Sequence, residues 1–138
     1  MMHLGLLVTV AASWYLVGLS VTVGLVTYPS FARVGDAEWV TFHDHHSARI
    51  SWAVGGAWFA QIIGLVCWFG RADTQIAWWV TVIGAVSAIA VTAFFAVDLH
   101  RQLSDARSAR VLRRLRRIHA VRTICWLIAA LAATSALA

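Results

Sequence analysis

The sequence contains no lysine and only six acidic residues, and none of these acids lies inside a long hydrophobic run. A small proton-coupled exporter of this size is expected to carry a membrane-embedded carboxylate, so the lack of one disfavours a transporter. The uncharged runs are therefore expected to be plain membrane-spanning segments. They cover residues 4–32, 50–70, 74–97 and 123–138.

Cysteine is equally scarce, with two residues in the whole chain. In the expected arrangement Cys67 lies near the outer end of the second span and Cys125 near the inner end of the fourth. The two thiols cannot meet without moving most of a membrane thickness, which excludes a Cys-x-x-Cys redox centre. Strict alternation of apolar and polar residues is also lacking in the four runs, which excludes a transmembrane β-barrel.

What is present is a very apolar chain of 138 residues, of which 61% are hydrophobic, with a mean hydropathy of +0.76. About 20 apolar residues cross the ~30 Å hydrocarbon core as a helix, so we predict an all-α integral membrane four-helix bundle. One domain covers residues 1–138, with spans at about 4–27, 50–69, 75–97 and 120–138. The first run exceeds the roughly 7 to 15 residues of a signal-peptide core and follows no basic residue, so we expect a mature helix.

The arginines are unevenly distributed along the chain. Two flank the first connection between spans, one lies in the second connection, and eight follow the third run. Cytoplasmic loops of membrane proteins collect lysine and arginine. The first and third connections are therefore predicted to be cytoplasmic, with the N-terminus and the C-terminus both outside.

The third connection also predicts a basic amphipathic segment before the last helix. Ser104 and Asp105 can cap residues 106–117, in which apolar residues interleave with six arginines at helical spacing. Such a segment would lie on the inner leaflet, so anionic membrane lipids are the predicted partners and nucleic acid is not. The pattern leaves open whether the segment only sets the topology, and whether copies of the chain form a homo-oligomer.

Half of the six histidines lie within residues 43–46. At 100° per residue the first and last of these share a face with Gln61, whereas His45 falls on the other side. Four alternating spans bring further histidines of the third and fourth helices to the same membrane depth. Because helix bundles commonly hold metals between facing side chains, we predict a metal site with these ligands: His43, His46, His100 and His119.

Several chemistries remain open for this cluster. Nitrogen ligands suit zinc, copper, iron or nickel, and the sequence does not distinguish among them. Axial ligation of haem by two of the histidines is a weaker alternative, because haem would want two opposed imidazoles deeper in the bundle. A purely interfacial role, with the imidazoles bound to headgroups and water, is the remaining alternative.

The last hydrophobic run is short. Counted from Thr123 it has 16 residues, or about 24 Å of helix, less than the hydrocarbon core. Spanning would draw His119 and Arg122 into the membrane, where ionisable groups usually face the bundle interior. Snorkelling of Arg122 to the surface is the plain alternative. Trp126 shares this face, and the predicted substrate pocket consists of Trp14, Gln61 and Trp126.

Four short motifs carry a resemblance to a known family. They are Tyr28-Pro29-x-Phe31, Val34-Gly35-x-x-Glu38-Trp39, His43-x-x-His46-x-x-Arg49-Ile50 and Arg122-Thr123-x-x-Trp126. The chain resembles the small four-span bacterial membrane proteins grouped loosely with the anthrone oxygenase-like family. The resemblance implies a multi-pass protein of the bacterial inner (plasma) membrane that oxygenates a lipophilic, often aromatic, substrate. The chain departs from that pattern at His119, where such relatives often have asparagine.

The leading hypothesis is a metal-dependent membrane oxidoreductase or oxygenase that acts on a lipophilic substrate near the cytoplasmic face. In this hypothesis the histidines hold the metal and Arg122 orients an anionic or carbonyl group, while Tyr28 or Glu38 assists proton transfer. The alternative from another class is a non-enzymatic lipid-binding or accessory membrane subunit, organised by the arginine-rich segment.

Overall fold

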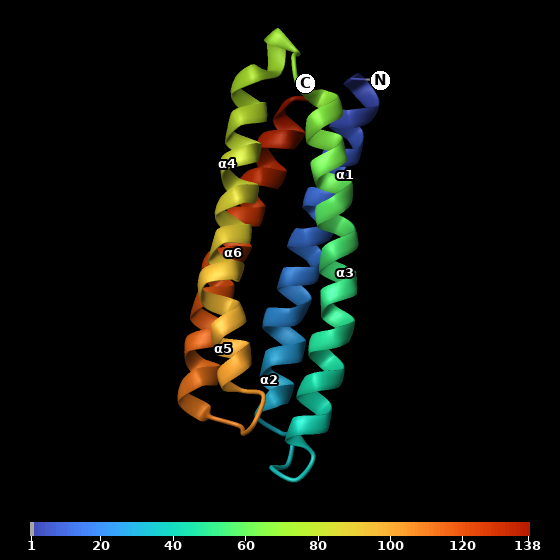
Figure 1. Ribbon diagram of the computed structural model, residues 1–138. Helices are drawn as coiled ribbons and strands as arrows, with labels where there is room; N and C mark the ends of the chain where they lie inside the picture. The colour runs from blue at the N-terminus through green and yellow to red at the C-terminus, as the bar shows by residue number, and fades with distance from the viewer. Residues whose placement is uncertain (1) are drawn as a thin grey trace.

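The computed structural model describes residues 2–138, and this part of the chain is helical with short connections and no strand. Four helical stretches are long and apolar enough to cross a membrane. Figure 1 shows them running side by side, with the N-terminus and the C-terminus at the same end. The predicted all-α class and the number of long apolar helices are confirmed.

The first helical stretch is continuous through a proline. It comprises α1 (Met2–Thr22), the π-helical η1 (Val23–Thr27) and α2 (Tyr28–Phe31). The backbone N–H of Tyr28 donates to the carbonyl of Val23, five residues earlier. The wider turn gives the ring of Pro29 room that a regular turn lacks. The first helix therefore continues to Phe31, beyond residue 27, where the predicted first span ends.

The second helix, α3 (Trp39–Trp68), is unbroken over 30 residues. It begins at Trp39, well before the predicted span at about 50–69. Asp36 does not cap it, because the N-cap is Glu38 and no side chain bonds the first turn. Asp36 instead pairs with Arg107 at 3.0 Å, which ties together the two connections at this end of the bundle.

The third helical stretch also contains a wide turn. It follows the short 3-10 helix η2 (Ala72–Thr74) and comprises α4 (Gln75–Val91), the π-helical η3 (Thr92–Ala96) and α5 (Val97–Gln102). Single π-turns inside α-helices are rare and are frequent at functional sites. The two π-turns, η1 and η3, both lie in the half of the bundle away from the chain termini (Figure 1).

The last helix, α6 (Ala109–Ser135), is one piece of 27 residues. The prediction of a separate basic segment before the last helix is wrong, because the arginine-rich residues form the first turns of α6 itself. The predicted cap at Ser104 and Asp105 is also displaced, since the hydroxyl of Ser108 accepts the N–H of Val111. The arginines therefore project from a helix that continues directly into the bundle.

The helices pack as two pairs. The structure packs α1 against α3 and α4 against α6, and joins the pairs through α1 and α6, whereas α3 and α4 scarcely touch. We call the end with residues 32–38 and 103–108 the arginine end, and the end with both termini the terminal end (Figure 1). Cys67 and Cys125 are free thiols, as the sequence predicts.

Candidate functional site

Two histidines from different helices are in direct contact at the arginine end. His43 on α3 is buried, and its Nε2 lies 3.2 Å from Nδ1 of His100 on α5. The indole of Trp39 stacks on the His43 ring with 5.4 Å between the centroids. The Trp39 N–H donates to the carbonyl of Leu103 at 2.7 Å. The pair is therefore held in place by the first turn of α3 and the end of α5.

His119 on α6 is held in a single neutral form by its hydrogen bonds. Arg122 can only donate, and its Nη2 lies 2.6 Å from Nδ1 of His119, so Nδ1 is the acceptor. The proton is then on Nε2, which donates to the carbonyl of Ser20 at 2.8 Å. Gly24 in η1 lies against the imidazole and has no side chain to keep it away. The wide turn and this glycine together seat His119 against the first helix.

The predicted four-histidine metal site is not assembled. Two imidazole nitrogens on one tetrahedral metal lie about 3.3 Å apart, so the separation of His43 and His100 suits two ligands. His119 cannot join them, because both of its nitrogens are bonded and the Arg122 guanidinium beside it repels cations. Among residues 2–138 no group of three or more His, Cys, Asp or Glu side chains could hold a metal ion. The donor set does not fit, and we derive no step through a metal.

A cavity of about 350 Å³ lies beside the histidine pair. Its walls are α3 on one side and η3 with α5 on the other, and Tyr28 and Arg122 also line it. Ser51, Gly55 and Val97 line it and are exposed, so its mouth faces the outside of the bundle between α3 and the η3–α5 stretch. Ligand pockets commonly have volumes of about 300 to 1,000 Å³. The cavity is thus large enough for a small molecule that enters from the side.

Three of the residues that line this cavity each carry a buried polar atom with no hydrogen-bond partner among the described residues. The atoms are Oγ of Ser47, Nε1 of Trp58 and Nε of Arg122. Buried polar groups are nearly always bonded, because leaving one unpaired costs about 1 to 3 kcal/mol. The indole and guanidinium nitrogens can only donate. The wall of the cavity therefore contains unused donors, the kind of group that an acceptor oxygen would satisfy.

Arg122 lies far from both ends of its helix. It is 13 residues from each end of α6, or about 20 Å at 1.5 Å per residue. Its Nη1 makes a long contact of 3.5 Å with the hydroxyl of Thr92 in η3. Within residues 2–138 no carboxylate lines the cavity or pairs with Arg122. Charges at membrane depth are normally paired, so this cation is the strongest sign of an anionic or polar ligand.

A smaller space of about 20 Å³ continues the cavity toward the middle of the bundle. Arg122 and Trp58 line both spaces, and Trp126 closes the smaller one. This volume suffices for one water molecule, which needs about 10 to 15 Å³. Trp126 therefore lies next to the site, as its predicted face requires, and contacts the space beneath the cavity.

Other predicted site residues lie elsewhere. Trp14 is partly exposed and donates to the hydroxyl of Thr134 in the terminal half of the bundle. Gln61 is buried and donates to Ser13 on α1 at 3.0 Å, which makes it a helix-to-helix contact. Glu38 is exposed at the start of α3. None of these three residues lines the cavity described here.

The remaining candidates occupy the positions that their helix faces require. His46 lines the cavity and packs edge-on against Phe31, with 5.0 Å between ring centroids. His45 is exposed, as expected. Sequence reasoning missed Ser47 and Trp58, although counting 100° per residue from His43 places both on the same face as the histidine itself. Thr92 was missed because no sequence pattern around it predicts a π-turn.

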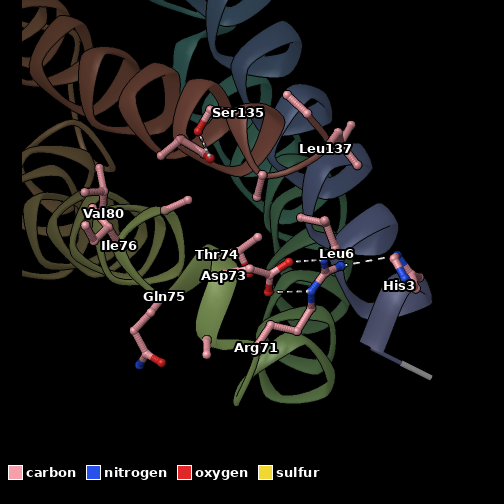
Figure 2. A pocket seen from close by; sticks show the side chains of 15 residues that line it. His3, Leu6, Arg71, Asp73, Thr74, Gln75, Ile76, Val80, Ser135 and Leu137 are labelled. Atoms are coloured by element: carbon pink, nitrogen blue, oxygen red, sulfur yellow. Dashed lines mark hydrogen bonds and ion pairs between the residues drawn. The ribbon is translucent and has the colours of Figure 1, made fainter.

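A larger cavity, of about 810 Å³, lies at the terminal end. Figure 2 shows Arg71 pointing into it toward Asp73 and His3. Arg71 donates to both carboxylate oxygens of Asp73, at 3.3 and 2.6 Å, and these bonds raise the pKa of Arg71 above its ordinary value. The cation here already has its counter-ion. The terminal cavity consequently lacks the unpaired charge that distinguishes the site around Arg122.

Comparison with known proteins adds no relative. No family model, curated protein or solved structure matches the chain. The site must therefore be interpreted from its own residues.

Proposed function

We propose that the cavity binds a lipophilic small molecule through an oxygen atom of a carboxylate, carbonyl or phenolate group. The supporting observation is that three of the four unpaired buried polar atoms belong to residues that line this one cavity, namely Ser47, Trp58 and Arg122. The apolar part of the wall, on Ile50, Val54, Ala96 and Val97, suits a hydrocarbon or aromatic body. An anion beside Arg122 would neutralise the unpaired guanidinium.

The histidine pair supports a proton-transfer role at the bound molecule. His100 lines the cavity, and its other neighbour, His43, points Nδ1 toward the exposed carboxylate of Asp44 at 3.9 Å. Two imidazoles in contact can pass a proton, because each ring has one nitrogen that donates and one that accepts. His100 would exchange a proton with the ligand, and His43 would connect it to the aqueous edge. Tyr28, which also lines the cavity, could hold the reacting oxygen.

These roles are proposed to serve an oxidoreductase or oxygenase that acts on a lipophilic substrate, the class that the family resemblance implies, with dioxygen as the oxidant. In this proposal Arg122 orients the substrate oxygen and the histidines manage the proton. The metal predicted from the sequence has no part in these steps. The arginine end is proposed to lie on the cytoplasmic side of a bacterial inner membrane, with both termini outside, because arginines are enriched in cytoplasmic loops.

Ligand binding can be measured through the fluorescence of Trp58 in the purified protein. The probes are anthrone, oleate and dodecane, which supply a carbonyl, a carboxylate and no oxygen. We expect anthrone or oleate to bind at least about tenfold more tightly than dodecane, because a hydrogen bond to a charged donor contributes about 1.5 to 3 kcal/mol. Replacing Arg122 with glutamine should remove this preference.

Two matched variants control the measurement. Arg110→Gln removes an exposed arginine from the same helix outside the cavity and should leave binding unchanged. Trp52→Phe removes a tryptophan that is 86% exposed on α3, six residues before Trp58, and should leave the ligand-dependent signal intact. Equal affinities for all three probes, or an equal loss in Arg110→Gln and Arg122→Gln, would remove the proposal.

A further inference from the structure

A second hollow lies on the opposite side of the wall that Tyr28 and His119 form. This groove has a volume of about 620 Å³ and runs between the first helical stretch and α6. Tyr28 lines both the cavity and the groove, and its ring meets His119 edge-on with 4.9 Å between the centroids. The groove is thus a space separate from the cavity, and Tyr28 is the one described residue that lines both.

Three arginines lie together at one end of the groove. Arg113, Arg116 and Arg117 are exposed, and no acidic residue among residues 2–138 lines the groove with them. The ion pairs described for arginine use Arg71 and Arg107 instead. Three guanidinium groups without a carboxylate favour a multiply bonded anion such as a phosphate, whose oxygens accept from several donors at once.

Exposed apolar side chains line the groove further along the helices from the arginines. Val21, Leu25 and Ile124 line it and are 43%, 74% and 58% exposed. From Arg116 to Ile124 the helix rises about 12 Å. A free phosphate would leave these side chains uncovered, whereas an acyl chain attached to a phosphate would cover them. The arginines would face the charged headgroup of a phospholipid, and the apolar side chains beyond them would face its acyl chain.

We propose that this groove is a binding site for one anionic phospholipid. Its phosphate lies among Arg113, Arg116 and Arg117, and one acyl chain lies along Val21, Leu25 and Ile124. This assigns a defined site to the anionic lipids that the arginine content predicts. Such a site differs from general attraction of the protein to an anionic membrane surface. Only the arginines on one face of α6 would contact the lipid, and the neighbouring arginines would not.

Native mass spectrometry of the full chain released from detergent tests the site. The probes are dioleoylphosphatidylglycerol, dioleoylphosphatidylcholine and free glycerol 3-phosphate. We expect one phosphatidylglycerol to remain bound, with phosphatidylcholine and glycerol 3-phosphate at least about tenfold weaker. Arg113→Ala and Arg116→Ala should each weaken phosphatidylglycerol by about tenfold. Arg114→Ala removes the same charge from another face and should not.

A second pair of variants keeps every arginine in place. Ala120 is exposed and lines the groove, so Ala120→Phe should fill it and reduce the bound phosphatidylglycerol. Val121 is 48% exposed but does not line the groove, so Val121→Phe is the matched control. Equal losses in Arg113→Ala and Arg114→Ala, or unchanged binding in Ala120→Phe, would overturn the site. Binding of glycerol 3-phosphate as tight as that of the lipid would do the same.

Discussion

At the scale of single residues, the position of His119 depends on Gly24 having no side chain. A Cβ at that position would lie 3.3 Å from Cδ2 and Nε2 of the imidazole, which is tighter than an ordinary contact. The imidazole could retreat only by lengthening its 2.8 Å bond to the carbonyl of Ser20. His119 in turn accepts from Arg122, so this glycine indirectly sets the position of the cation in the cavity.

Gly24→Ala should therefore lower the free energy of unfolding by about 1 to 3 kcal/mol, the usual cost of overpacking. Gly18→Ala on the same helical stretch has nothing within 4 Å of its added Cβ. It should be neutral or stabilising by up to about 1 kcal/mol, since alanine is the better helix former. Thermal unfolding in detergent, followed by circular dichroism, compares the two. Equal shifts in both variants would show that His119 is not seated against Gly24.

At the scale of helices, the contact between α1 and α3 is shorter than the spacing of small residues on α3 predicts. Gly56, Ala60 and Gly64 recur at four-residue spacing on α3, which predicts a close neighbour along the whole row. The two glycines of the row differ. A Cβ at Gly64 would lie 2.5 Å from Oγ1 of Thr9 and 3.0 Å from the carbonyl of Gly5 on α1. A Cβ at Gly56 would have nothing within 4 Å. The helices α1 and α3 approach most closely in the terminal half.

Gly64→Ala should accordingly destabilise the protein by about 1 to 3 kcal/mol or more, because the added methyl meets backbone that cannot rotate away. Gly56→Ala on the same helix should be neutral or slightly stabilising. Unfolding midpoints of the purified variants in one detergent decide between these outcomes. A Gly56→Ala variant as unstable as Gly64→Ala would mean that α3 contacts a neighbour along its full length.

The helices could be predicted from the sequence because length and hydropathy alone define them. The face of His43 and the inward position of His119 and Arg122 also followed from helical periodicity and from the short last run. The π-turns could not be predicted, since a shift from four-residue to five-residue hydrogen bonding has no sequence signature. The first of these turns places Gly24 against His119, and the second places Thr92 beside Arg122. The hydrogen bonds that occupy both nitrogens of His119 were therefore missed. This is why a four-ligand metal site was predicted and is not assembled.

At the scale of the whole molecule, the two hollows and most of the charge lie toward one end. Nine of the eleven arginines lie in the half of the bundle at the arginine end, Arg122 lies at the middle of α6, and Arg71 lies near the other end. The exposed rim between α3 and the η3–α5 stretch gives the cavity a lateral mouth, through which a lipophilic molecule could enter without crossing water. The same distribution of arginine makes the orientation of the chain testable.

Cysteine labelling in cells can test that orientation. In a chain whose native cysteines are replaced by alanine, single cysteines are introduced at exposed alanines: Ala37 and Ala106 at the arginine end, and Ala72 and Ala138 at the terminal end. Because arginine-rich loops stay in the cytoplasm, a membrane-impermeant maleimide should label only the cysteines at the terminal end from outside. The cysteines at the arginine end should react only after the membrane is opened.

The same four variants separate the fold from its orientation. If the cysteines at positions 37 and 106 are labelled from outside and those at 72 and 138 are not, the up-and-down fold holds and the chain is inserted the other way. The phospholipid groove would then lie in the outer leaflet. Labelling of 37 and 106 from opposite sides would contradict the fold itself, because the Asp36–Arg107 ion pair places their two connections at one end.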